Sequence, residues 1–98
     1  MHVTYKTKKL EKICTVAHTA QKEYGIRMAE KINQRIGEIK ASDNVNEMIE
    51  FNLGRCHALK GNRKNQFAVD LVHPYRLVFE ELNNEIVIAN ILEIIDYH

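Results

Sequence analysis

Two parts of the sequence carry side chains that can transfer protons or bind phosphate. One is the stretch CHALKGNRKNQ, which contains an imidazole and several cations, and the other is the end of the chain. A further arginine lies between them. The candidate site residues are His57, Lys60, Arg63, Lys64, Arg76, Asp96, Tyr97 and His98. Such a set is typical of a site that acts on a phosphodiester.

Cleavage of RNA by its own 2′-hydroxyl needs these groups. A protein must accept the proton of the hydroxyl, donate a proton to the leaving 5′-oxygen and stabilise the extra charge on the phosphate. Histidine, whose reference pKa is about 6.5, can perform either proton transfer near neutral pH. Arginine and lysine stabilise the phosphate electrostatically, and a tyrosine ring can stack on a base or orient the phosphate. This chemistry requires neither a metal nor a cofactor.

Each of these residues also has an ordinary structural interpretation. A single histidine is more often a hydrogen-bonded structural residue, and the basic stretch could be a solvated loop. Cys56 beside His57 could suggest a nucleophile or a metal pair, but a buried, inert thiol is the commoner case. The same holds for Cys14 on an apolar helix face. The functional interpretation therefore depends on the loop and the chain end occurring together.

The length and composition are those of one small globular domain covering residues 1–98. Hydrophobic residues make up 45% and charged residues 28% of the chain, which excludes a disordered or collagen-like protein. No apolar run approaches the roughly 18 residues of a membrane helix, so we expect no membrane partner. Two cysteines are too few for a disulfide framework and favour a reducing cytoplasm.

The formal net charge of +1 is unevenly distributed along the chain. Residues 51–76 contain five basic side chains and one acid, a net charge of +4. Residues 77–98 contain five acids and no lysine or arginine, a net charge of −5. A local basic cluster in a nearly neutral chain is expected to attract a polyanion at one place.

Periodicity predicts the elements that must position the candidate residues. Leu10, Ile13, Cys14, Ala17 and Tyr24 fall on one stripe at helical spacing, whereas alternation of period two marks the strands further on. The expected helices cover residues 8–24, 27–41 and 45–50. Thr7 can cap the first helix, and Ser42, Asp43 and Asn44 offer caps for the third. The inner face of the second helix is expected to consist of Ala29, Ile32, Ile36 and Ile39. The expected strands cover residues 2–6, 56–59, 67–71, 75–80 and 85–95, the last being apolar on both faces and therefore central.

Helices followed by an antiparallel meander predict an α+β domain, with an N-terminal helical hairpin packed on a small antiparallel β-sheet. Arg76 has the opposite parity to Leu77 and Phe79, so it is expected to point away from their layer. Because the chain ends directly after the apolar strand, the last residues can be held by the sheet. The open face of the sheet could therefore collect the candidate residues.

Three motifs together resemble the RelE/HigB family of bacterial toxins. They are HALKGNRK at residues 57–64, YRLVF at residues 75–79 and the terminal DYH. The resemblance is strongest to the HigB branch, the plasmid maintenance killer proteins, and it covers the whole chain in order and length. Ala58 and Asn62 depart from the proline and aspartate that are usual there, and neither departure removes a proposed catalytic group.

The resemblance implies a RelE-like, microbial ribonuclease-type fold and a ribosome-dependent endoribonuclease that cuts mRNA in the ribosomal A site. It implies that His57 and His98 form the acid–base pair, that Asp96 is a base or orients a histidine, and that Tyr97 contacts a base or phosphate. The implied phosphate ligands are Lys60, Arg63, Lys64 and Arg76. The implied partners are a HigA-like helix-turn-helix antitoxin, the 70S ribosome carrying mRNA, and operator DNA reached through the antitoxin complex.

Two other functions remain open at this stage. A ParE-like toxin on the same scaffold would inhibit DNA gyrase without cutting anything, and it would have no use for His57 and the terminal DYH. A nucleic-acid-binding module would hold phosphates with the basic loop, with salt-dependent binding and no cut product.

Overall fold

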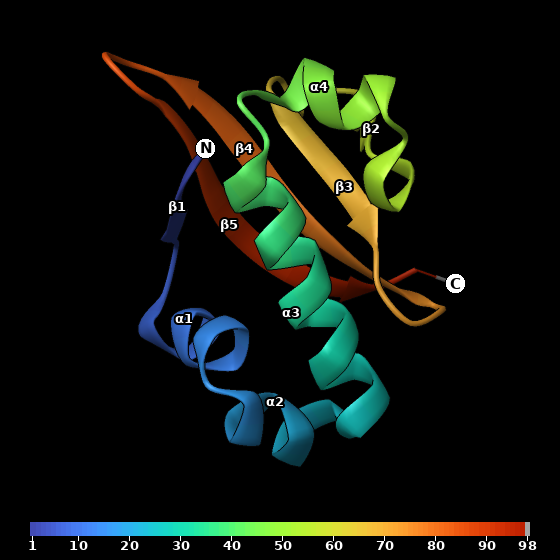
Figure 1. Ribbon diagram of the computed structural model, residues 1–98. Coiled ribbons are helices and arrows are strands. Elements are labelled where there is room, and N and C mark those ends of the chain that lie inside the picture. Colours follow the sequence, from blue (N-terminus) through green and yellow to red (C-terminus); the bar gives the residue numbers. More distant parts are fainter. Residues whose placement is uncertain (98) are drawn as a thin grey trace.

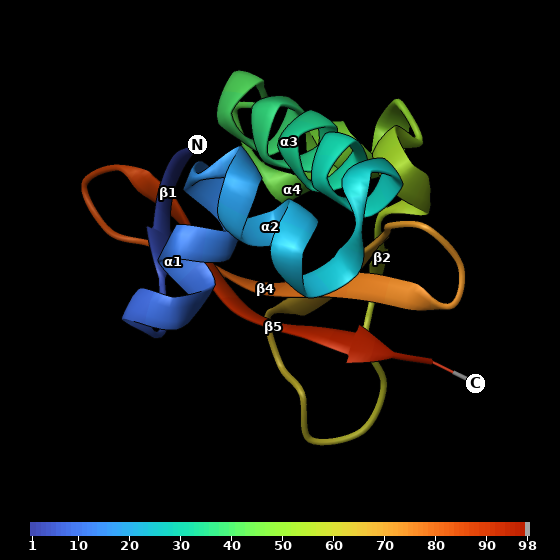
Figure 2. The ribbon, with the colours of Figure 1, turned by 90° about the horizontal axis from the view of Figure 1, so that it is seen from below.

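The computed structural model describes residues 1–97, which fold into one layer of helices on one face of a β-sheet (Figures 1 and 2). The strands are β1 (His2–Tyr5), β2 (His57–Ala58), β3 (Gln66–Asp70), β4 (Tyr75–Asn83) and β5 (Val87–Asp96). The helices are α1 (Lys8–Thr15), α2 (Ala17–Tyr24), α3 (Ile26–Ala41), α4 (Val45–Glu50) and the short 3₁₀ helix η1 (Leu53–Arg55). The predicted α+β class is confirmed.

The sheet has the strand order β1-β5-β4-β3-β2. Neighbours are antiparallel except for β1, which pairs in parallel with the first half of β5. The sheet is therefore mixed, and the expectation of a purely antiparallel sheet is wrong on this point. After β1 the chain passes through the helices to the opposite edge of the sheet at β2. It then returns strand by strand through β3 and β4, until β5 lies beside β1 in the parallel direction. The predicted central position of the last strand is confirmed, since β5 lies between β1 and β4.

The helical region before Gly25 is broken rather than continuous. Thr7 caps α1 as predicted, since its hydroxyl accepts a hydrogen bond from the backbone N–H of Leu10. The chain then adopts an extended conformation at Val16, with φ −116° and ψ 105°, so one predicted helix becomes two. The break rotates the apolar stripe: Ala17, which was expected to face inward, is exposed, whereas Ala20 is buried.

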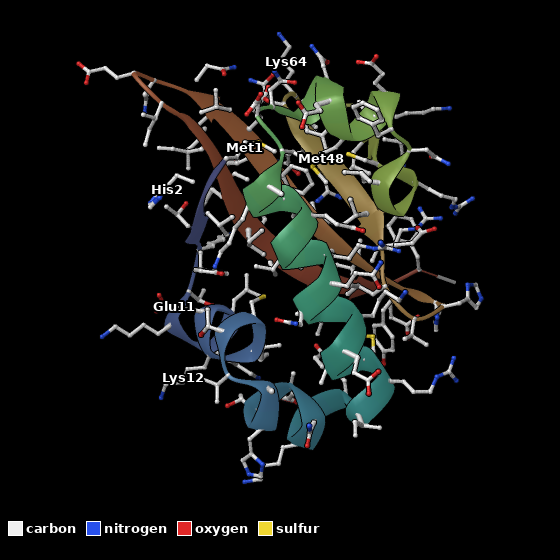
Figure 3. The ribbon with its side chains drawn as sticks, viewed as in Figure 1. Met1, His2, Glu11, Lys12, Met48 and Lys64 are labelled. Atoms are coloured by element: carbon white, nitrogen blue, oxygen red, sulfur yellow. The ribbon has the colours of Figure 1, made fainter. Side chains whose placement is uncertain are left out.

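The other two helices confirm the sequence-based prediction. In α3, Ala29, Ile32, Ile36 and Ile39 are all buried, as their spacing indicated. The Asn44 side chain caps α4 by accepting a hydrogen bond from the N–H of Glu47. Figure 3 labels the buried Met48 on this helix. No helix within residues 1–97 is both long and apolar enough to cross a membrane.

The core lies between the helices and one face of the sheet. Val69, Leu77, Phe79 and Ile91 contribute from the strands and pack in one cluster with the buried residues of α3. In β5, Leu92 is an extra residue relative to β4, because Val78 pairs with Glu93 and Phe79 with Ile91. We call the face away from the helices the open face.

Replacing Gly54 by alanine is expected to lower the free energy of unfolding by about 1–3 kcal/mol. Gly54 has a φ of 58°, and an added Cβ would lie 2.7 Å from Nε of Arg35. That guanidinium cannot move without losing its hydrogen bonds to the Asp70 carbonyl oxygen and to Glu38. Thermal unfolding should record a Tm lower by at least about 4 °C.

Gly37→Ala is the matched control. Gly37 is exposed in the interior of α3, and an added Cβ would meet nothing within 4 Å. Because alanine loses less backbone entropy in a helix than glycine, this change should stabilise the protein by about 0.5–1 kcal/mol. Equal Tm shifts for the two substitutions would contradict the assignment of strain to Gly54.

Candidate functional site

The open face carries most of the candidate residues within the described part of the chain. His57 pairs with Ala68, and Arg76 pairs with Asp70 on one side and Ile95 on the other, so these side chains share the face away from the helices. The loop of residues 59–65 between β2 and β3 hangs below this same face in Figure 2. The predicted outward orientation of Arg76 is confirmed.

His57 is held at the edge of the sheet in a defined orientation. Its Nδ1 lies 2.8 Å from the backbone carbonyl oxygen of Arg55. A carbonyl oxygen can only accept, so Nδ1 carries the hydrogen in this contact. In the neutral ring Nε2 then bears the lone pair, and in the charged ring it bears a proton that it can donate. The ring is partly exposed, as a proton-transfer group must be.

Arg63 extends from the loop across the open face to β5. Its Nε donates to Oε1 of Gln66 at 2.9 Å, and its Nη2 donates to Oε2 of Glu93 at 2.7 Å. The Arg63 side chain, which sequence analysis assigned to phosphate, is therefore already engaged by a carboxylate. Ala68 and Val78, which also face away from the helices, have no accessible surface.

Lys60 and Lys64 lie in the same loop and are exposed. Figure 3 shows Lys64 at the end of the molecule where α4 lies. The end of β5 lies near the turn between β3 and β4, at the opposite end of β3 (Figure 1). The loop therefore reaches β5 at Glu93 rather than at the last residues of the strand.

A second cluster forms where β3 and β4 meet. Oδ2 of Asp70 lies 2.5 Å from Nε of Arg55, and its Oδ1 lies 3.5 Å from Nε of Arg76. The ring of Tyr97 lies against the guanidinium of Arg76, whose Cζ is 4.4 Å from the ring centroid. The backbone N–H of Tyr97 donates to the carbonyl oxygen of Pro74, which fixes Tyr97 against the turn between β3 and β4. Arg76 is thus positioned by both a carboxylate and an aromatic ring.

The structure places the Asp96 side chain on the opposite face of the sheet from Tyr97 and His57. Asp96 pairs with Tyr75, and alternation along β5 places it on the opposite face from Ile95 and Tyr97. Strands β3 and β4 also separate β5 from β2, which amounts to roughly 14 Å at a spacing of about 4.8 Å per strand. His98 lies outside the described residues, so its expected approach to His57 stays a prediction.

Two hollows accompany these clusters. The larger, about 530 Å³, is polar and is lined by Lys6, Arg63, Gln66, Glu80, Asn90, Leu92 and Glu93. The smaller, about 70 Å³, is lined by Arg55, Asp70, Leu71, His73, Pro74, Tyr75, Arg76 and Tyr97. The larger hollow is lined by two cations and two carboxylates, whereas in the smaller one Arg55 and Arg76 outnumber Asp70. The smaller hollow is therefore the one suited to an anionic ligand.

Sequence reasoning missed Arg55, Asp70 and Glu93 as parts of the site. A signal for Asp70 was present, because the antiparallel hairpin around His73 places residues 70 and 76 directly opposite each other. The contact between Arg63 and Glu93 had no such signal, since it depends on how a loop folds over the sheet.

The two cysteines do not take part in this site. Both thiols are buried and unpaired, and burial raises the pKa of Cys14 and of Cys56 to about 12. A thiol with that pKa is almost wholly protonated at neutral pH and is a poor nucleophile. Among residues 1–97, no group of three or more His, Cys, Asp and Glu side chains could hold a metal ion.

Glu93→Gln is expected to loosen the loop with little effect on global stability. The ion pair of Arg63 and Glu93 is partly exposed, so its loss should cost only about 0–1 kcal/mol. The loop contains Lys60, Arg63 and Lys64, all trypsin sites, and limited trypsinolysis should cut it faster in the variant. Glu85→Gln, at the exposed turn between β4 and β5, is the control. Equal cutting rates in the two variants would show that Glu93 does not restrain the loop.

No protein-family model matches the chain, and no curated protein matches its sequence. Among solved structures, the chain is similar to the YoeB/ParE toxin from Agrobacterium tumefaciens, with a TM-score of 0.69 and 18% sequence identity. The similarity covers 100% of this chain and 99% of that chain. At this identity the match establishes a shared fold, which agrees with the α+β class predicted from the sequence.

Proposed function

We propose that this protein is the toxin of a type II toxin–antitoxin system, of the RelE/ParE superfamily and HigB-like, that cuts translated mRNA in the ribosomal A site. The fold that it shares with a YoeB/ParE toxin supports the first part of this proposal. The observation that carries the second part is that a proton-transfer group, His57, and the positioned guanidinium of Arg76 lie on the same open face.

The proposed reaction is an internal transesterification of RNA. The 2′-oxygen loses its proton and attacks the adjacent phosphorus, the bond from phosphorus to the 5′-oxygen breaks, and that oxygen takes up a proton. The products are a 2′,3′-cyclic phosphate and a 5′-hydroxyl. His57 performs one of the two proton transfers through Nε2, since Nδ1 is held by the Arg55 carbonyl oxygen. His98 performs the other, and we propose no order between the two.

The cations of the open face bind the phosphate and stabilise the charge that develops on it. Arg76 is the main ligand, since Asp70 and Tyr97 hold its guanidinium in place. Arg63 joins it by exchanging Glu93 for phosphate. Lys60 and Lys64, at the other end of β3, attract the RNA backbone, and Tyr97 offers the outer part of its ring to a base. Asp96 orients His98 or acts as a base beside it.

The partners follow from this assignment. We propose that a HigA-like helix-turn-helix antitoxin neutralises the protein and that their complex binds operator DNA. The protein cuts its substrate on the 70S ribosome, which presents mRNA in its A site in the cytoplasm. The reaction uses no cofactor and no metal ligand from this chain.

Inducible expression followed by mapping of mRNA 5′ ends tests the proposal. We expect new ends inside coding regions, in frame with translation, that vanish when translation is blocked. Growth arrest with no new ends would contradict the proposal and favour the ParE-like inhibition of DNA gyrase. Salt-dependent RNA binding with neither arrest nor new ends would favour a simple nucleic-acid-binding module.

A further inference from the structure

Two arginines from different elements share one carboxylate on the open face. Arg55 approaches Oδ2 of Asp70 from η1, and Arg76 approaches Oδ1 from β4. In both cases the approaching atom is Nε, at 2.5 Å and 3.5 Å respectively. No other hydrogen bond or ion pair of these two guanidinium groups occurs in the described part of the chain. Their terminal nitrogens are therefore available for a ligand.

We call Arg55, Asp70 and Arg76 together the clamp, because two guanidinium groups flank one carboxylate. In the planar group one Nη lies on the same edge as the Nε–H, and the other Nη lies on the opposite edge. Asp70 hydrogen-bonds Nε of Arg55 and forms a looser ion pair with Nε of Arg76, so the Nη atoms of both arginines are left for a ligand. The small hollow of about 70 Å³ lies among Arg55, Asp70, Arg76 and Tyr97.

A hydrogen bond from the helical layer fixes the backbone around the clamp. Nε of Arg35 in α3 donates to the carbonyl oxygen of Asp70 at 2.7 Å. The same side chain packs so closely on Gly54 that a Cβ would not fit. Arg35 therefore fixes η1, which carries Arg55, relative to β3, which carries Asp70. Arg55 itself adopts a φ of 51° in this tight turn.

The charge of the cluster selects the ligand. Two guanidinium groups and one carboxylate leave a net charge of +1, which matches the single negative charge of a phosphodiester. Arginine binds phosphate oxygens through paired N–H donors, and the Nη atoms that Asp70 does not engage can supply them. Arg55 also orients His57 through its carbonyl oxygen, so the clamp and the proton-transfer group belong to one segment.

We infer that Arg55 and Arg76 jointly bind one phosphodiester of the RNA, and that Asp70 is the positioning residue that sets both guanidinium groups. This inference rests on the proposed function for the identity of the ligand. It adds Arg55 to the phosphate ligands and gives Asp70 a role that its negative charge alone would not suggest.

The test is the binding of a single-stranded RNA oligonucleotide with 2′-deoxy substitutions, which cannot be cut, measured at several salt concentrations. Arg55→Gln should weaken binding roughly 10-fold. It should also reduce the slope of log K against log salt by about 0.7, the loss of one phosphate contact. The control is Arg27→Gln, which removes the same charge from an exposed position on α3. Identical affinity and slope for the two variants would overturn the inference.

Asp70→Asn tests the positioning role separately. A mere change of net charge would strengthen RNA binding, because a negative charge is lost. We expect instead that binding of the same oligonucleotide weakens roughly 10-fold, and that Asp70→Glu restores part of it. An Asp70→Asn protein that binds the oligonucleotide as tightly as the wild type, or more tightly, would overturn the positioning role.

The oligonucleotide assay also separates this inference from the proposed reaction. A wild-type protein that binds RNA through Arg55 but leaves ribosome-bound mRNA intact would refute the reaction and support the clamp. A protein that cuts mRNA and binds RNA equally well without the Arg55 guanidinium would support the reaction and refute the clamp.

Discussion

Replacing His57 by alanine is expected to lower the rate of mRNA cleavage by roughly 10²–10⁴-fold, the usual contribution of a positioned acid or base. The imidazole is partly exposed on the open face, and its Nδ1 contact with Arg55 presents Nε2 for proton transfer. Alanine removes that group. A single-turnover assay on ribosomes programmed with a defined mRNA measures the effect directly, and growth inhibition in cells should be relieved in parallel.

The control for His57→Ala is His18→Ala, which removes an exposed imidazole from α2 on the helical side of the molecule. It should cut mRNA at the wild-type rate. Deletion of His98 should act like His57→Ala, because the proposed reaction needs two proton transfers. Undiminished toxicity of both His57→Ala and the His98 deletion, at equal protein levels, would contradict the enzymatic account and point to gyrase inhibition.

Arg76→Gln is expected to lower the cleavage rate by roughly 10²–10³-fold, as the loss of a preorganised charge in other active sites does. Asp70 and the ring of Tyr97 hold the guanidinium in place before any substrate binds. Arg76→Lys should recover little of the loss, because an ammonium group has no planar face for Tyr97 and no forked donors for phosphate. Rates measured over a range of salt concentrations test this.

Arg27→Gln serves again as the control for a lost charge. The same readout distinguishes the Arg76 site from a general basic surface. Full rescue of cleavage by lysine would show that only the charge at position 76 matters. A rate for Arg76→Gln equal to that of Arg27→Gln would remove Arg76 from the site.

Elements with strong periodicity could be predicted from the sequence. The buried stripe of α3, the caps at Thr7 and Asn44 and the alternation of β3 and β4 all depend on local chemistry, and the structure confirms each. The break at Val16 was missed because a straight helix would place Ala17 and Tyr24 on the same stripe. The parallel pairing of β1 was missed because a short strand gives no sign of its distant partner.

The candidate site was only partly predictable, for a related reason. Parity along β4 indicates where Arg76 points, so its place on the open face followed from the sequence. The partners of the charged residues did not follow, because they lie 30 residues away for Arg63 and 15 residues away for Arg55. A count of charges along the chain treats every cation as available to a polyanion. In the fold, Asp70 and Glu93 engage three of the five cations of residues 51–76.

The arginines of the site already form ion pairs with carboxylates before the substrate binds. In the acidic last segment, Glu93 is paired with Arg63, and the open face carries Arg63 near one end of β3 and Arg76 at the other. A bound phosphate would compete with Glu93 for Arg63, whereas it would complete the donors of Arg76 without displacing Asp70. These two arginines should therefore differ in their salt dependence.

The most direct test of the central claim is to incubate the purified protein with ribosomes carrying a defined mRNA and to identify the ends of any fragments. The account predicts a cut within the codon in the A site, with a 2′,3′-cyclic phosphate on one fragment and a 5′-hydroxyl on the other, and no cut in the same mRNA without ribosomes. Ribosome-bound mRNA that stays intact in the presence of active, folded protein would contradict it.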